Sequence, residues 1–407
     1  MKQLKLYIQS ALYNIRHNPA YASFFIGGTA LSFIFVTIAL QITSIMFYKT
    51  PPNVNSKRIV LVSCWDQDKK GQYIARLDKE GITNLMKYVK NYETYSFIQM
   101  QPMTFIVNEQ MRSNVVHFVN ADYWKIYKFN FIEGRPFTEN DYHTPVLVIS
   151  ASCAKLYFKN GSAINQKIEF QGNTFQVIGV VEDFSMLAMG GAHSVWAPYT
   201  FNKFFPNMTS QYELHVLFPE NFTPEQMSQN VVDALRRNAE TQHMEVDIDT
   251  SMYPNDYSLR MDQMFNGILT YGIPIVIFLL LIIPAINIIT LSIANTANRA
   301  EEIAIRRALG ADKSSAFFQS ITEYIILVFL GTCLGLLLVY PVFYVINNIF
   351  IEATPVSGFT LFPELNISVV LLGVLPLAML FSLLSGGLPA YLIAKKNIAN
   401  TLKGGSK

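Results

Sequence analysis

Four long runs without a charged side chain constrain the fold of this chain more than any other feature. The runs cover residues 21–47, 264–298, 324–351 and 365–394, and none contains Asp, Glu, Lys or Arg. The hydrocarbon core of a bilayer is about 30 Å thick, so a helix of roughly 20 apolar residues crosses it. The sequence therefore predicts an α-helical membrane protein with four transmembrane helices. Because the first run exceeds the roughly 7–15 apolar residues of a cleaved signal peptide, we expect it to remain as a span.

Residues 48–263, between the first and second runs, contain no comparable apolar stretch. Strand-like and helix-like hydrophobic patterns alternate there without a repeat, which predicts a large α+β domain inserted between the first two helices. The expected elements are strands at 58–65 and 115–119, a helix at 82–92, and a hairpin whose strands, 167–170 and 175–181, flank a Gly-containing turn.

Two further segments of this domain carry local signals. Thr223 and Gln226 have the spacing of a capping box, which predicts a helix that continues to about Asn238. Residues 186–191 are rich in Met and Gly and lack strand alternation. This composition predicts either an adaptable contact surface or a packed loop.

Basic residues near the ends of the runs predict the orientation in the membrane. Lys and Arg that flank spans stay preferentially in the cytoplasm. They occur before the first run, in segment 299–323 and in the tail 395–407, whereas segment 352–364 has two Glu and no basic residue. Both ends of the chain are therefore predicted to be cytoplasmic, and 48–263 and 352–364 to lie outside.

The first twenty residues predict a separate amphipathic helix. Leu4, Ile8, Leu12 and Ile15 recur at helical spacing, and Asn18-Pro19 marks a break before the first run. We expect residues 1–20 to lie at the cytoplasmic membrane surface. The alternative is a continuation of the first span into the cytosol.

The sequence has no recognisable catalytic, cofactor or metal motif. No stretch matches the phosphate-binding loop G-x-x-x-x-G-K-[ST], and the six His residues lack the H-E-x-x-H spacing. The net charge of +2 is too small to suggest a nucleic-acid partner. Cys64 and Cys153 both belong to the outer domain, where a disulfide is chemically permitted, and the sequence leaves their pairing open.

Small residues in two of the runs predict close helix packing. Gly27 and Gly28 lie in the first run, and Gly331 and Gly335 form a small-xxx-small step in the third. Such glycines suit either a contact between two copies of the chain or packing within one copy, and the sequence leaves both open.

The segment between the second and third runs predicts a short cytoplasmic helix. Glu302 and Arg306 form an i,i+4 pair, and Gly310 is a suitable C-terminal stop. A helix of this kind is suited to dock into a groove of another protein. The alternative is a solvated connecting loop.

The residues of this segment resemble a known family. Glu302–Ala311 reads E-I-A-I-R-R-A-L-G-A and resembles the E-I-G-[IL]-R-[RK]-A-L-G-A signature of the FtsX-like permease domain in the MacB family of ABC transporters. Only Ala304 departs, in place of Gly. Further resemblances lie at 12–16, 119–124, 134–141 (G-R-x-F-x-x-x-D), 175–181 and 388–403. In the last of these, Ile398 stands where Pro is usual, and Tyr391 and Leu392 replace basic residues.

This resemblance implies a permease subunit that acts as a homodimer or heterodimer in the bacterial inner membrane, with its large domain in the periplasm. The subunit itself would hold no cofactor, and ATP would be hydrolysed by a separate ABC ATPase. The residues implied to dock that ATPase are Glu302, Ile303, Ile305, Arg306 and Leu309. ATP-driven closure would be transmitted through the spans to the periplasmic domains by mechanotransmission. The Gly134-Arg135 turn is expected to shape the domain rather than to bind substrate.

Three functions agree with this resemblance. The first is efflux or export of periplasmic cargo, such as antibiotics or peptides, with a periplasmic adaptor and an outer-membrane channel. The second is lipoprotein release of the LolC/LolE type, which has the same topology. The third is a membrane-tethered signalling scaffold that regulates a periplasmic enzyme. The sequence identifies neither the cargo nor the ATPase.

Overall fold

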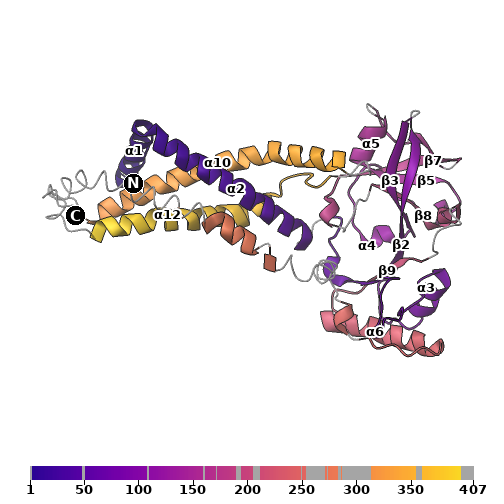
Figure 1. The fold of residues 1–407 in the computed structure, drawn as a ribbon. Coiled ribbons are helices and arrows are strands. Elements are labelled where there is room, and N and C mark those ends of the chain that lie inside the picture. The colour runs from indigo at the N-terminus through magenta and orange to yellow at the C-terminus, as the bar shows by residue number, and fades with distance from the viewer. Residues whose placement is uncertain are drawn as a thin grey trace. The chain divides into compact units, whose positions relative to one another are not determined.

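The computed structural model describes residues 2–47, 51–107, 110–158, 161–170, 172–188, 194–204, 211–248, 250–253, 271–272, 274–282, 286, 313–353 and 360–395. The chain divides into two compact units. The helical unit comprises residues 1–44, 268–344 and 364–407, and the sheet unit comprises residues 45–267 and 345–363. Each unit is considered by itself below (Figure 1).

The helical unit is built from long apolar helices. Its named elements are α1 (Lys2–His17), α2 (Pro19–Phe47), α10 (Lys313–Ala353, of which the last residues belong to the sheet unit), α11 (Ile367–Val369), a π-helical turn (Val370–Val374) and α12 (Leu375–Lys395). Three stretches of described helix are long and apolar enough to cross a membrane: Pro19–Ile45, Ile321–Ile349 and Ile367–Ser385. They coincide with the first, third and fourth predicted spans.

The second predicted span, 264–298, lies largely outside the described residues. Within it the structure describes 271–272, 274–282 and 286, and residues 274–282 are helical. A count of four transmembrane helices therefore stays a prediction. The predicted cytoplasmic segment 299–323 stays a prediction; its last residues already belong to α10, which begins at Lys313. Residues 313–323 contain no Gly or Pro that would stop a helix.

The predicted break after the N-terminal helix is confirmed. Asn18 is not helical, and α2 starts directly with Pro19. Proline suits the first position of a helix because its missing N–H would have no partner there. The Asn18 carbonyl accepts the N–H of Ala22 at 3.0 Å, which starts the new hydrogen-bond ladder. The location of α1 at a membrane surface stays a prediction.

The last span contains an irregular turn. Residues Val370–Val374 are π-helical, and the N–H of Leu375 donates to the carbonyl of Val370, five residues back. Pro376 follows at once and has no N–H for the carbonyl four residues earlier. The helix then continues regularly as α12.

The sheet unit is organised around one mixed β-sheet. Its strands are β1 (Ile59–Val62), β2 (Thr94–Val107), β3 (Gln110–Val119), β4 (Phe131–Gly134), β5 (Val146–Ser150), β6 (Lys167–Phe170), β7 (Asn173–Val181), β8 (Val195–Pro198) and β9 (Glu213–Leu217). The described strands follow the order β1-β9-β2-β3-β8-β5-β7-β4, and β6 pairs with β2 and β7. The pairs β3–β8 and β5–β7 are parallel and the others antiparallel.

Short helices complete this unit and confirm its α+β class. They are α3 (Lys79–Met86), α4 (Tyr123–Ile126), α5 (Ala151–Phe158) and α6 (Pro224–Thr241), with 3₁₀ turns at Ser56–Arg58, Glu139–Asp141, Met186–Ala188, Tyr199–Phe204 and Thr250–Met252. In Figure 1, α3 and α6 lie together beside β9, whereas α5 lies near β3, β5 and β7. One hydrophobic core joins α3 and α6 to β1 and β9, and another joins α5 to β3, β5 and β7.

Several local predictions are confirmed in the sheet unit. The strands β6 and β7 form the predicted antiparallel hairpin. Thr223 and Gln226 form both hydrogen bonds of the capping box at the start of α6. The predicted helix 82–92 is displaced, because Asp78 caps α3 through the N–H of Gly81 at 2.8 Å. The chain then leaves the helix after Met86 and turns at Asn91, which has a φ of 53°.

Candidate coupling site

The residues predicted to dock an ATPase lie outside the described residues. They are Glu302, Ile303, Ile305, Arg306 and Leu309, within the segment 301–312 that precedes α10. Their role therefore stays a prediction. The contacts described below involve α2, α10 and the start of the last span.

Gly331 and Gly335 bring α10 into close contact with α2 within one chain. A Cβ atom added at Gly331 would lie 2.6 Å from Thr29 Cβ and 3.0 Å from the Ile26 carbonyl oxygen. A Cβ at Gly335 would lie 2.8 Å from the Ala30 carbonyl oxygen. Carbon atoms in contact are normally about 3.5–4.0 Å apart, so only glycine permits this approach. Packing within one copy thus accounts for this glycine pair.

Gly27 and Gly28 have a different environment. A Cβ added at either position would meet no heavy atom within 4 Å. Gly27 and Gly28 therefore face open space on α2 and do not pack against the other described helices of this chain. A contact between two copies through this face stays a prediction.

A set of hydrogen bonds joins the end of α2 to the start of the last span, inside the helical unit. Gln41 Nε2 donates to the Glu364 carbonyl at 3.0 Å, and Gln41 Oε1 accepts the N–H of Asn366 at 3.2 Å. Asn366 Nδ2 donates to Ser44 Oγ at 3.3 Å. Asn366 also caps α11 by accepting the N–H of Ser368 at 2.9 Å. The entry into the last span is thereby fixed to α2.

A second set of hydrogen bonds, inside the sheet unit, begins at Asn347 near the end of α10. Asn347 Nδ2 donates to the Phe362 carbonyl at 2.8 Å. Asn347 Oδ1 accepts the N–H groups of Leu361 at 3.1 Å and Phe362 at 3.0 Å. One amide side chain thus satisfies three backbone groups of the segment that leads to the last span.

The same segment is paired with a loop of the large domain. Thr360 forms a parallel β-bridge with Ser185, and the Ser185 hydroxyl donates to the Leu361 carbonyl. Phe184 precedes this serine and packs against Trp196 and Phe129, with ring centroids 6.2 and 5.4 Å apart. The bridge therefore leads directly into an aromatic cluster of the domain. We name residues 184–188, Asn347 and 360–362 the coupling site.

The loop predicted at 186–191 is partly described. Residues 186–188 form a 3₁₀ turn, Ala188 is buried, and its carbonyl accepts a hydrogen bond from Asn53 Nδ2. The burial of Ala188 agrees with a packed loop at this point of the segment. Residues 189–191 lie outside the described residues. The sequence signal that points to the coupling site is the polar Asn347-Asn348 doublet within an otherwise apolar run, because polar groups in such runs are costly.

The G-R-x-F-x-x-x-D motif braces the sheet unit. Gly134 has a φ of 71°, and a Cβ there would lie 2.1 Å from the Ile178 carbonyl oxygen. Arg135 donates from Nη1 and Nη2 to the two Asp141 carboxylate oxygens at 2.7 and 2.9 Å. Asp141 also accepts the N–H of Thr138 at 2.8 Å. The guanidinium of Arg135 and these donors hold the pKa of Asp141 well below its usual range. The motif thus shapes a turn, as expected.

The two cysteines of the sheet unit are free thiols. Cys153 is fully buried in the core beside α5, and burial raises its pKa to about 12. Cys64 is half-buried and packs at the edge of the other core. The two thiols belong to different hydrophobic cores, and the possible disulfide is not formed.

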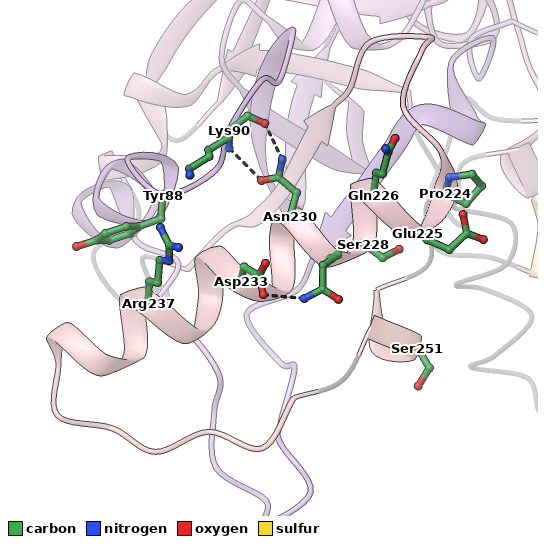
Figure 2. A pocket seen from close by; sticks show the side chains of 11 residues that line it. Tyr88, Lys90, Pro224, Glu225, Gln226, Ser228, Asn230, Asp233, Arg237 and Ser251 are labelled. Atoms are coloured by element: carbon green, nitrogen blue, oxygen red, sulfur yellow. Dashed lines mark hydrogen bonds between the residues drawn. The ribbon is translucent and has the colours of Figure 1, made fainter.

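A polar hollow lies along α6, and several of its polar side chains are already hydrogen-bonded within the protein. It has a volume of about 700 Å³ and is lined by Tyr88, Lys90, Ser251 and residues of α6 between Pro224 and Arg237 (Figure 2). Asn230 exchanges two hydrogen bonds with the Lys90 backbone, at 2.8 and 3.0 Å. Gln229 donates to Asp233 at 2.7 Å. In the part of the chain that the structure describes, no three His, Cys, Asp or Glu side chains gather to hold a metal ion.

Two family profiles match this chain, and together they cover most of its residues. The sequence profile of the MacB-like periplasmic core domain matches residues 23–234, which is just over half of the chain. The profile of the FtsX-like permease C-terminal domain matches residues 274–398. The chain belongs to the MacB/FtsX-like permease family. The family profiles thus cover α2, most of the sheet unit and the predicted docking segment.

Individual members of the family are distant relatives. The macrolide export ATP-binding/permease protein MacB of Haemophilus ducreyi is 28% identical over 233 residues, which are 56% of this chain and 32% of that protein. The uncharacterized ABC transporter permease YknZ of Bacillus subtilis is 22% identical over 311 residues, 73% of this chain and 71% of that protein. The chain spans about a third of the length of this MacB relative. The crystal structure of the periplasmic region of MacB from Actinobacillus actinomycetemcomitans aligns with 55% of this chain and 98% of its own, at 16% identity and a TM-score of 0.40.

Proposed function

We propose that this protein is the membrane-spanning subunit of an ABC transporter that works by mechanotransmission. A separate ATPase binds Glu302, Ile303, Ile305, Arg306 and Leu309, and its closure moves the helices and, through them, the sheet unit. The cargo is periplasmic, such as an antibiotic or a peptide, and is exported with a periplasmic adaptor and an outer-membrane channel. Two permease copies act together in the inner membrane, with both chain ends cytoplasmic and the sheet unit periplasmic.

The observation that carries this proposal is the hydrogen bonding of residues 360–366. Asn347 and Ser185 bind residues 360–362 in the sheet unit, and Gln41 and Ser44 bind residues 364 and 366 in the helical unit. Along the chain, only Pro363 separates the two sets. In the proposed mechanism, a displacement of the last span reaches the Ser185 loop along this short segment.

The identity of the partners tests the proposal first. The tagged protein is purified from its native host in mild detergent, and the proteins that accompany it are identified by mass spectrometry. An ABC ATPase with an adaptor supports the export function. An ATPase with a lipoprotein carrier would assign lipoprotein release instead. If no ATPase is found even after crosslinking, the proposal fails, and a tethered signalling scaffold replaces it.

Charge reversal at both Glu302 and Arg306 tests the docking residues. We expect this double variant to lose the ATPase during purification, because a docking face depends on complementary charge. A matched control reverses Lys69 and Asp247, an exposed ion pair of the sheet unit at 3.7 Å. Normal ATPase co-purification and coupling in the Glu302 and Arg306 variant would contradict the assignment.

The coupling site is tested without knowledge of the cargo. Asn347→Ala leaves the N–H groups of Leu361 and Phe362 without their acceptor, which costs about 1–3 kcal/mol locally. Hydrogen exchange is measured on the complex in lipid nanodiscs, with and without ATP. We expect the nucleotide-dependent change at residues 184–188 to disappear, while the ATPase remains bound. The control, Thr322→Ala, removes a hydroxyl that donates to the Phe318 carbonyl within α10. An unchanged nucleotide response in Asn347→Ala would refute coupling through this site.

A further inference from the structure

Two large aromatic side chains of the sheet unit are exposed on one loop. The loop covers residues 63–78, between β1 and α3. Trp65 is 68% exposed and Tyr73 is 52% exposed. Exposed aromatic rings that gather at one place mark interaction sites, because they offer much apolar surface at little conformational cost.

The loop is held in place by buried carboxylates. Asp68 Oδ1 accepts the N–H groups of Lys70 and Gln72, both at 2.9 Å. Asp66 accepts the N–H of Ser63 at 2.9 Å, and its carbonyl accepts the N–H of Ile74 at 3.0 Å. Both aspartates are buried. Exposure of the two rings is therefore a feature of an ordered loop.

The two rings border an apolar pocket of about 350 Å³. Cys64, Ala75 and Met244 supply further apolar or weakly polar walls. This volume lies in the range of about 300–1,000 Å³ that is typical of small-molecule sites. An engineered cavity of about 150 Å³ accommodates benzene, so this pocket has room for two or three fused rings.

Among the described lining residues, the one charged side chain is already engaged in an ion pair. Arg76 is the charged side chain of the lining, and it forms an ion pair with Asp78. Gln211 and Gln242 add side-chain amides, and Gln211 Oε1 already accepts the N–H of Leu77 at 3.0 Å. An anionic ligand would have to compete with Asp78 for Arg76, whereas a neutral polar group would find a side-chain amide.

We propose that this pocket binds an uncharged, planar aromatic molecule of about two or three fused rings, which stacks against Trp65 and Tyr73. A neutral hydrogen-bonding substituent on the ring pairs with the amide of Gln211 or Gln242. The pocket shares no residue with the coupling site. Binding therefore does not depend on the transport mechanism proposed above, and each proposal can fail without the other.

Ligand binding is measured through the alkylation rate of Cys64, because this residue lines the pocket and is half-buried. The full chain in lipid nanodiscs is alkylated with iodoacetamide, and each cysteine is followed separately by peptide mass spectrometry. Burial raises the pKa of the Cys64 thiol, so the reaction is run at about pH 8.5. The probe is naphthalene-2-carboxamide, and its isosteric anion naphthalene-2-carboxylate serves as the charged comparison.

We expect the carboxamide to protect Cys64. At a concentration about ten times its Kd, the free pocket falls to about a tenth, and alkylation slows about tenfold. Trp65→Ala and Tyr73→Ala should each weaken this protection, and Trp65→Phe should keep most of it. Ile132→Ala, which removes an exposed apolar side chain on β4, is the matched control and should behave as wild type.

Three results would overturn the proposal. The first is unchanged Cys64 alkylation in the presence of the carboxamide. The second is equal protection in wild type and in the Trp65→Ala, Tyr73→Ala double variant, which would place the probe elsewhere. The third is equal protection by the carboxylate, which would contradict a pocket for neutral ligands.

Discussion

The close approach of α2 and α10 predicts a strong asymmetry between two glycine-to-alanine substitutions. In Gly331→Ala, the new Cβ would lie 2.6 Å from Thr29 Cβ and 2.8 Å from Thr29 Cγ2. Carbon atoms need about 3.5–4.0 Å, so the helices must separate by about 1 Å. Overpacking of this kind costs about 1–3 kcal/mol.

Gly27→Ala is the matched control, because its Cβ meets no heavy atom within 4 Å. Both variants share the gain in helix propensity of about 1 kcal/mol that Ala has over Gly. The difference between them therefore isolates the packing cost. We expect Gly331→Ala to be less stable than Gly27→Ala by about 1–3 kcal/mol.

The assay is unfolding of the purified protein by SDS titration, followed by far-ultraviolet circular dichroism. Tryptophan fluorescence would not serve, because Trp65, Trp124 and Trp196 all belong to the sheet unit. Thr29→Gly removes both side-chain atoms that the new Cβ meets, so it should restore stability in the double variant relative to the single Thr29→Gly. If the Gly331→Ala variant is at least as stable as the Gly27→Ala variant, the reasoning is refuted.

Three other outcomes are expected. Asp141→Asn should lower the free energy of unfolding of the sheet unit in urea by about 1 kcal/mol at pH 7; the effect is modest because Arg135 is half-exposed. Because the folded protein lowers the pKa of Asp141, the stability advantage of the wild type should persist down to about pH 4 and shrink only below it. Iodoacetamide should modify Cys64 in the folded protein but Cys153, with its raised pKa and full burial, only after denaturation. Asp68→Ala should accelerate hydrogen exchange at Lys70 and Gln72 in the loop 63–78, because both backbone amides lose their acceptor.

Features encoded by neighbouring residues were predictable from the sequence. The β6–β7 hairpin depends on a Gly-containing turn, and the start of α6 depends on two residues three positions apart. The break at Asn18-Pro19 follows from the backbone of proline. The apolar runs that coincide with three described helices follow from the thickness of a bilayer.

Features that depend on distant residues were not predictable. The parallel pairing of β3 with β8 joins Val116 to Val195, and no local pattern specifies such a partner. The coupling site likewise brings Ser185 to Thr360, far apart along the chain. An apolar pattern also gives no sign that Gly331 contacts α2 whereas Gly27 faces open space, because that depends on which helix faces are in contact.

The π-helical turn at Val370–Val374 has a consequence for how this protein tolerates changes in length. A π-turn holds one residue more than the α-helical turn that it replaces. Deletion of one residue there would leave a regular helix, and because a π-turn and an α-turn each complete about one revolution, the residues that follow would keep their orientation relative to those before. Ser382 and Ser385, which are buried on α12, would then stay on their present face. Homologues that lack this extra residue should carry their small polar residues one position closer to the start of the span, on the same helix face.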